Sequence, residues 1–304
     1  MLKTKHFLTL QDVDNDELDA LVNLAQTLKH QRGAADSPQP LAGKSIGMIF
    51  SKASTRTRVS FEVGIHELGG QSMFLGIDQL QLGRGETVAD TAMVLCRYLH
   101  GVVIRSHEHE GVEAFAACSS VPVINGLTDR YHPCQLVADL QTIAESAGRV
   151  AGVSVAYLGD GASNMANSWA IAASLAGIDL RVGAPVGYQL DAALLEKLEG
   201  PGRVTVTDDP VAAVADADFV YTDVWVSMGF EEEAKDRLAV MAPYQVNETL
   251  LEQATPDVKV LHCLPAYRGK EITAEVLDGP RSLVWDQAEN RLHAQKAVLT
   301  ALIR

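Results

Sequence analysis

The sequence predicts an α/β protein of two domains, each a parallel sheet flanked by helices. Short apolar strands alternate with longer amphipathic helical segments along the chain, a pattern typical of parallel sheets covered on both faces. The alternation restarts near residues 148–152, after a long helical segment. With 304 residues, 47% of them hydrophobic, the chain exceeds the length at which one core usually stops growing. Two cores are therefore expected.

The elements can be placed in order from their hydrophobic spacing. An amphipathic helix is expected over residues 14–30, and a turn-rich stretch then leads into an apolar strand at residues 45–50. Helical spacing returns at residues 59–68, 133–147 and 283–303. Further buried strands are expected at residues 101–104, 121–124, 153–158, 180–182, 204–206, 219–222 and 258–262.

The restart of the pattern fixes the expected domain boundary. We place residues 1–148 in the first domain and residues 149–285 in the second, while the last helix could pack on either one. Ligands of open parallel sheets bind beyond the carboxyl ends of the strands. Polar residues directly after predicted strands are therefore the first candidates for a site.

Composition excludes several classes of protein. The 39 acidic and 25 basic residues give a formal net charge of -14, which repels nucleic acids and anionic membranes. The four cysteines lack the spacing of a zinc site or a disulfide scaffold, and this favours a reducing cytoplasm. The chain shows no cleavage-site pattern and no apolar run near the ~18 residues of a membrane helix, so we expect a soluble, untargeted protein.

The strongest candidate for an anion site follows the strand at residues 45–50. There, Ser54-Thr55-Arg56-Thr57 runs into the next helix, which Ser54 or Thr55 can cap. Backbone N–H groups at a helix start carry roughly half a positive charge, and hydroxyls and an arginine beside them would complete a phosphate cradle. An ordinary capped helix with solvated arginines is the alternative.

Two further candidates follow strands in the first half. Arg105 ends an apolar strand and could reach the same pocket, or it could be a surface arginine. His132 and Gln135, in the run His132-Pro133-Cys134-Gln135, open a helix whose first turn suits proline. Their imidazole and amide could polarise a carbonyl and hold an amide nitrogen, although a histidine at a helix start is often structural.

The second half carries three more motifs after strands. The turn from Gly159 to Asn164 resembles a dinucleotide-binding fingerprint but lacks its third glycine, so a tight strand-to-helix turn is the simpler interpretation. Asp223, followed by Ser227-Met228-Gly229, offers a carboxylate and a hydroxyl suited to an amino acid, or else a loop turn.

The last of these motifs is His262-Cys263-Leu264-Pro265, at a strand end. Because adjacent residues of a strand point to opposite sides, we expect His262 and Cys263 not to share a metal ion.

Taken in order, Ser54-Thr55-Arg56-Thr57-Arg58, His132-Pro133-Cys134-Gln135, Asp223 with Ser227-Met228-Gly229, and His262-Cys263-Leu264-Pro265 resemble the aspartate and ornithine carbamoyltransferase family. The similarity runs from about Phe7 to the C-terminal helix. It implies a carbamoyl phosphate domain, an amino-acid domain and a final helix, residues 286–304, that returns to the first domain. The serine-methionine-glycine and histidine-cysteine pairs resemble the ornithine branch.

The resemblance also implies roles for individual residues. Carbamoyl phosphate would be bound by Ser54, Thr55, Arg56, Thr57, Gln81, Arg105, His132, Gln135, Cys263, Leu264 and Arg291, with Gln81 reaching into a neighbouring subunit. Ornithine would be bound by Asn164, Asp223, Ser227 and Met228. The implied catalytic residues are Arg105, His132, Asp223 and Cys263. The implied assembly is a homotrimer or a multiple of trimers.

The expected reaction converts L-ornithine and carbamoyl phosphate into L-citrulline and phosphate, in arginine biosynthesis, without a metal or an organic cofactor. Three alternatives stay open from the residues. They are transfer to another amine or amino acid, a nucleotide-dependent dehydrogenase, and a non-catalytic protein that binds carbamoyl phosphate.

Overall fold

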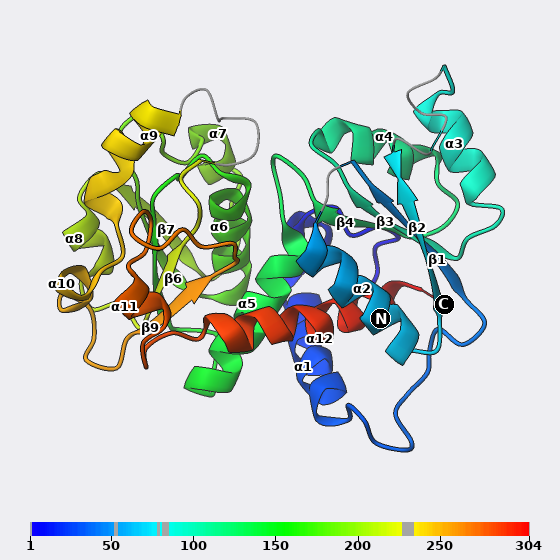
Figure 1. Cartoon of the computed structure of the whole chain (residues 1–304), viewed down its shortest axis with the longest axis horizontal. Helices are drawn as coiled ribbons and strands as arrows, with labels where there is room; N and C mark the ends of the chain where they lie inside the picture. The colour runs from blue at the N-terminus through cyan, green and yellow to red at the C-terminus, as the bar shows by residue number, and fades with distance from the viewer. Residues whose placement is uncertain (1, 52–53, 78–79, 81–84, 227–233, 304) are drawn as a thin grey trace. The chain divides into compact units, whose positions relative to one another are not determined.

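The computed structural model in Figure 1 describes residues 2–51, 54–77, 80, 85–226 and 234–303. Its contacts divide the chain into unit 1, Met1–Gln141 with Asn290–Arg304, and unit 2, Thr142–Glu289. The predicted domain boundaries, after residues 148 and 285, stay a prediction, because a division by contacts does not show which segments fold independently. Among the described residues, no helix is long and apolar enough to cross a membrane.

Unit 1 contains a four-stranded parallel sheet with the strand order β2-β1-β3-β4. Its strands are β1 Ser45–Phe50, β2 Gln71–Gly76, β3 Gly101–Arg105 and β4 Val123–Leu127. Strands β1 and β3 are almost wholly buried, as their apolar runs predict. Because Phe50 pairs with Arg105, the segments that leave β1 and β3 begin side by side at the carboxyl edge of the sheet.

The helices with residues in unit 1 are α1 Asn15–His30, α2 Thr55–Glu67, α3 Val88–Leu95, α4 His109–Cys118, α5 Pro133–Ala147 and α12 Val284–Leu302. The C-terminal part of α12, red in Figure 1, lies against α1 and α2. Lys296 donates to Glu67 over 2.7 Å, and Lys29 donates to Asn290 over 2.8 Å. The predicted return of the final helix to the first domain is therefore confirmed.

Unit 2 contains a five-stranded parallel sheet with the strand order β7-β6-β5-β8-β9. Its strands are β5 Ser154–Leu158, β6 Asp179–Gly183, β7 Arg203–Thr207, β8 Phe219–Thr222 and β9 Lys259–His262. Its own helices are α6 Asn164–Ala176, α7 Ala192–Leu195, α8 Pro210–Val214, α9 Ala234–Met241, α10 Glu248–Leu251 and α11 Ala274–Leu277. Two 3-10 helices are also described, η1 Leu10–Asp12 in unit 1 and η5 Ala242–Tyr244 in unit 2.

The predicted α/β class with two parallel sheets is confirmed, and one strand was not expected. Strand β2 lies at the sheet edge and keeps Gln71 and Met73 exposed, so it has no buried apolar run to reveal it. The turn after β5 is a close-packed connection. A Cβ added at Gly161 would lie 2.8 Å from the Tyr188 carbonyl oxygen and 2.9 Å from the Ala184 Cβ, so this glycine is explained by packing alone.

Candidate active site

The helix start in unit 1 keeps its N-terminal dipole available. Ser54 is the N-cap of α2 and has an extended backbone, but its side chain makes no capping hydrogen bond. Thr55 and Arg56, in the first turn, are exposed, whereas Thr57 is buried. The prediction that Ser54 occupies the N-cap position is confirmed, but its hydroxyl does not form the expected capping hydrogen bond. The helix start therefore presents its partial positive charge and the Arg56 guanidinium to solvent.

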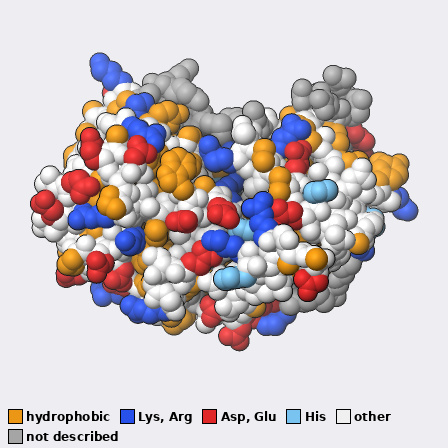
Figure 2. Space-filling view, turned by 60° about the horizontal axis from the view of Figure 1, so that its bottom comes forward, with side chains coloured by type: hydrophobic (Ala, Val, Ile, Leu, Met, Phe, Trp, Pro, Cys, Tyr) orange, Lys and Arg blue, Asp and Glu red, His pale blue; other side chains and the backbone are white. Residues whose placement is uncertain are grey.

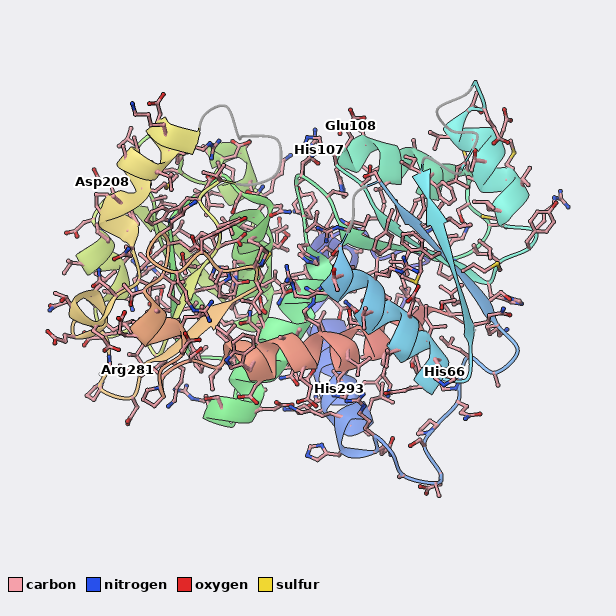
Figure 3. The ribbon with its side chains drawn as sticks, in the orientation of Figure 1. His66, His107, Glu108, Asp208, Arg281 and His293 are labelled. Atoms are coloured by element: carbon pink, nitrogen blue, oxygen red, sulfur yellow. The ribbon has the colours of Figure 1, made fainter. Side chains whose placement is uncertain are left out.

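Thr57 joins two buried arginines from distant parts of the chain. Its hydroxyl oxygen accepts 3.1 Å from Arg105 Nη1 and 2.9 Å from Arg291 Nη2. Arg105 is only 9% exposed and Arg291 only 4%, so the alternative of a surface arginine at position 105 is wrong. Figure 3 labels His107 and Glu108, which follow Arg105 beyond the carboxyl end of β3. Two desolvated guanidinium groups on one hydroxyl form an electropositive centre that favours an anion.

The start of α5 adds an imidazole and an amide to the same centre. Arg291 donates to the Gln135 side-chain oxygen, and its Nη1 lies 3.4 Å from His132 Nε2. Since a guanidinium can only donate, it selects the tautomer in which Nε2 carries the lone pair. Burial, reinforced by the charges of Arg291 and Arg105, holds the pKa of His132 well below its usual value. The imidazole is therefore neutral at physiological pH.

Unit 2 brings a carboxylate and a thiol together beyond two adjacent strands. Thr222 of β8 pairs with His262 of β9, so Asp223 and Cys263 are neighbours where the strands end. The Cys263 thiol donates to Asp223 Oδ1 over 3.0 Å. Burial raises the pKa of the Asp223 carboxyl, although the hydrogen bonds from the Cys263 thiol and the Val224 N–H oppose this. A buried carboxylate with an adjacent thiol can orient a cationic amine and accept a proton from it.

Two family models match almost the whole chain. The aspartate/ornithine carbamoyltransferase carbamoyl-P binding domain matches residues 5–145, and the Asp/Orn binding domain of the same family matches residues 151–302. This chain belongs to the aspartate/ornithine carbamoyltransferase family. The two matches correspond to the two sheets. Arg291 falls within the second match, although it belongs to unit 1 and bonds Thr57 and Gln135 of the first.

Individual relatives of this family are similar over their full lengths. The ornithine carbamoyltransferase of Bacillus subtilis is 52% identical over 305 residues, which cover 98% of this chain and 94% of that protein. That of Methanoculleus marisnigri is 50% identical over 300 residues, covering 98% and 97%. The solved structure of the Pyrococcus furiosus enzyme matches with a TM-score of 0.94 and 47% identity, covering 98% and 97%.

The family motif around Cys263 is held by hydrogen bonds to the buried side chains of His262 and Glu271. His262 Nδ1 accepts 2.9 Å from the Leu264 backbone N–H, so Nε2 carries the proton and faces Glu271 Oε1 at 3.3 Å. The same carboxylate accepts 2.5 Å from the Tyr267 backbone N–H. Leu264 is half-buried and adopts the left-handed φ of +58°. His262 and Glu271 thus shape the loop that carries Cys263 and Leu264.

The same motif brings three potential metal ligands together. One ligand atom each from Asp223, His262 and Cys263 lie within 4.8 Å of one another. The expectation that His262 and Cys263 diverge is wrong, because Cys263 lies past the end of β9, where strand alternation no longer applies. These atoms could hold a borderline-soft ion such as Zn²⁺. Both ring nitrogens of His262 already have protein partners, and the expectation that no metal is required stays a prediction.

Asn164 opens α6 after the turn that follows β5, as expected from its motif, and is half-buried. Sequence reasoning missed a buried ion pair beside it, in which Arg237 Nη1 lies 2.8 Å from Asp160 Oδ2. Asp160 also accepts from the Ala162 N–H over 3.0 Å, so the pair ties α9 to the turn that leads to Asn164. A lone aspartate between two glycines was the available signal.

Gln81, Ser227 and Met228 lie outside the described residues. A carboxylate that the motifs did not point to, Asp139, accepts 2.8 Å from Gln135 Nε2 in the buried interior of α5. On the face in Figure 2, acidic and basic side chains are interspersed. The chain has a net charge of -14, so the buried Arg105 and Arg291 form a local positive centre within a negatively charged protein.

Proposed function

We propose that this protein transfers the carbamoyl group of carbamoyl phosphate to the side-chain amine of L-ornithine, giving L-citrulline and phosphate. One observation carries the proposal: two buried guanidinium groups, Arg105 and Arg291, share the hydroxyl of Thr57 at the start of α2. Full-length identity of about half to ornithine carbamoyltransferases, such as the 52% over 305 residues with that of Bacillus subtilis, supports the same reaction.

In unit 1 the phosphate would bind at the start of α2, to Ser54, Thr55, Arg56 and Thr57. The exposed first turn, with no side-chain cap from Ser54, supports this placement of the anion. The carbamoyl group would then contact Arg105, His132, Gln135 and Arg291. We also assign Gln81 to this substrate, in a neighbouring subunit, and Cys263 and Leu264 to contacts with the carbamoyl group and the attacking amine.

In unit 2 ornithine would be bound by Asn164, Asp223, Ser227 and Met228. The hydrogen bond between Cys263 and Asp223 supports this assignment, because it fixes the Asp223 carboxylate in place beside the thiol, where it can accept a hydrogen bond from an incoming amine. The amine then attacks the carbonyl carbon, a tetrahedral intermediate collapses, and phosphate leaves. Asp223 and Cys263 orient the amine and help it lose its proton.

The energetics favour positioning as the main source of catalysis. Deprotonating an amine of pKa about 10.4 near pH 7.4 costs ~4 kcal/mol. Holding two substrates in attack geometry contributes roughly 7 to 11 kcal/mol, which exceeds that cost. The guanidinium groups of Arg105 and Arg291 then stabilise the developing oxyanion and the departing phosphate without reorganisation, since Thr57 already holds them in place.

We further propose a homotrimer, or a multiple of trimers, acting in the cytoplasm in arginine biosynthesis. Strand β2 lies at a sheet edge and leaves Met73 exposed, and Val59 on the neighbouring helix α2 is 50% exposed. Exposed apolar side chains at a sheet edge support burial against a second copy of the chain. All four cysteines are free thiols, which supports a reducing compartment.

The test is citrulline formation by the purified protein from carbamoyl phosphate and L-ornithine, with L-aspartate, putrescine and N-acetylornithine as parallel acceptors. Activity confined to ornithine supports the proposal, and activity with another acceptor replaces the amino-acid assignment. Silence with all four acceptors, together with tight carbamoyl phosphate binding, would favour a non-catalytic binding protein.

A matched pair of arginines tests the phosphate site. Arg56→Ala should lower kcat/KM by roughly two orders of magnitude, because one charge-assisted contact contributes up to ~3 kcal/mol. Arg58→Ala, two residues later on the same helix, is the control. Its guanidinium lies 3.0 Å from Glu62 and 3.9 Å from the centre of the Phe74 ring, so its loss should leave kcat/KM within about twofold. Near-normal kinetics for Arg56→Ala would overturn the phosphate assignment.

A further inference from the structure

The amide of Gln135 is held from both sides by partners with fixed hydrogen-bonding roles. Its Nε2 donates to Asp139 Oδ1 over 2.8 Å, one turn further along α5. Its oxygen accepts from Arg291 Nη1. Gln135 and Asp139 are both fully buried, at 0% exposure.

These partners select one of the two orientations of the amide. A carboxylate can only accept and a guanidinium can only donate, so both require the Gln135 NH₂ on the Asp139 side and the oxygen on the arginine side. An amide oxygen has two lone pairs, and Arg291 occupies one. The Gln135 oxygen therefore lies beside the centre formed by Arg105, Arg291 and His132, and its second lone pair can accept a further hydrogen bond there.

Several side chains of unit 1 are predicted to contact the carbamoyl group. Of these, the arginines can only donate hydrogen bonds, whereas the Gln135 oxygen can accept one. Arg105 and Arg291 present only N–H groups, and the Nε2 lone pair of His132 faces Arg291. A carbamoyl group differs from an acetyl group of the same shape by an NH₂ in place of a methyl. An oriented amide oxygen distinguishes the two, because it accepts a hydrogen bond from NH₂ and gains nothing from CH₃.

We propose that Asp139 is a positioning residue that turns the Gln135 oxygen toward the substrate and thereby sets the preference for a carbamoyl over an acyl group. This inference rests on the proposed function, since it takes the binding of carbamoyl phosphate in unit 1 as given. Asp139 acts through Gln135 and does not touch the substrate. Without the Asp139 carboxylate, the buried Nε2 of Gln135 loses its acceptor, and one of the two contacts that fix the amide orientation is gone.

An amide that rotates presents an N–H to the substrate NH₂, so two donors face each other. The Arg291 contact by itself opposes this rotation with one partner instead of two. The predicted consequence is specific: discrimination between NH₂ and CH₃ falls, while the charge-dominated binding of the phosphoryl group persists. A purely structural role for Asp139 would weaken both ligands equally.

The experiment uses two stable phosphonates that differ only at this position. Phosphonoacetamide carries the NH₂, and 2-oxopropylphosphonate carries a methyl in its place. Their Kd values are measured by calorimetry on the full-length protein. For the unmodified chain we expect the amide to bind roughly tenfold more tightly, the value of one well-made hydrogen bond in a buried site.

Three variants of Asp139 separate orientation from folding. Asp139→Leu, and the smaller Asp139→Ala if the leucine variant does not fold, should reduce the tenfold ratio to about twofold or less. Asp139→Asn keeps an acceptor of the same size for Nε2 and should restore most of the ratio. The control Asp12→Asn alters another carboxylate of unit 1, which accepts from the Leu8 and Thr9 N–H groups, and should leave the ratio unchanged.

The ratio of the two Kd values distinguishes a positioning role of Asp139 from a purely structural one. A ratio that stays near tenfold in folded Asp139→Leu or Asp139→Ala overturns the positioning role and leaves the proposed function standing. Equal weakening of both phosphonates also overturns it, in favour of a structural role. If the unmodified protein binds neither phosphonate, the proposed carbamoyl phosphate site fails and the inference fails with it.

Discussion

Replacement of Thr57 by valine removes the acceptor that two buried arginines share. The Thr57 oxygen accepts 3.1 Å from Arg105 and 2.9 Å from Arg291, and both donors are charged. A hydrogen bond to a charged group contributes about 1.5 to 3 kcal/mol. Valine has nearly the same shape as threonine, so no cavity opens. Taking the lower value for each bond, the free energy of unfolding should fall by about 3 kcal/mol.

The assay is urea unfolding of the unmodified protein, Thr57→Val and Thr57→Ser, each with and without saturating inorganic phosphate. Serine retains the hydroxyl and should unfold near the unmodified midpoint. Bound phosphate supplies oxygen acceptors for the same guanidinium groups, so it should narrow the gap between Thr57→Val and the unmodified protein. A valine variant as stable as the unmodified protein, or a gap that phosphate does not change, would refute this account of the arginine centre.

Two other predictions concern titratable groups. Burial raises the pKa of the Asp223 carboxyl, so the folded protein becomes less stable relative to the unfolded chain as pH rises through that pKa. Asp223→Asn removes this cost, and its free energy of unfolding at neutral pH should be higher by about 1 kcal/mol. The same variant should abolish citrulline formation. The pKa of His132 is lowered by burial, so below pH about 6.5 the unfolded chain binds a proton that the folded chain does not. Stability should therefore fall as pH decreases from 6.5, and urea unfolding of His132→Gln should show a smaller pH slope.

Much of the fold was predictable because it follows from local patterns. The buried strands β1, β3, β5 and β8 read as apolar runs, since strands covered on both faces carry few polar side chains. The edge strand β2 was missed because its residues do not alternate between apolar and polar, whereas the other edge strand, β7, alternates valine with threonine and was predicted. Strand alternation also predicted that His262 and Cys263 point to opposite sides. This failed because Cys263 lies past the end of β9, and the ligand atoms of the two residues lie within 4.8 Å of one another.

The order of polar motifs after strands was enough, by itself, to predict the family and the residues at the start of α2 and α5, because helix starts and strand ends are local features. The hydrogen bond between Thr57 and Arg291 could not be predicted from local patterns, because 234 positions of the chain separate the two residues. Only the return of α12 to unit 1 brings these groups into hydrogen-bonding distance. Likewise, the sequence contains Asp139 without indicating its role. Its function as the fixed acceptor for Gln135 depends on burial and on the arginine opposite, and both arise from tertiary packing.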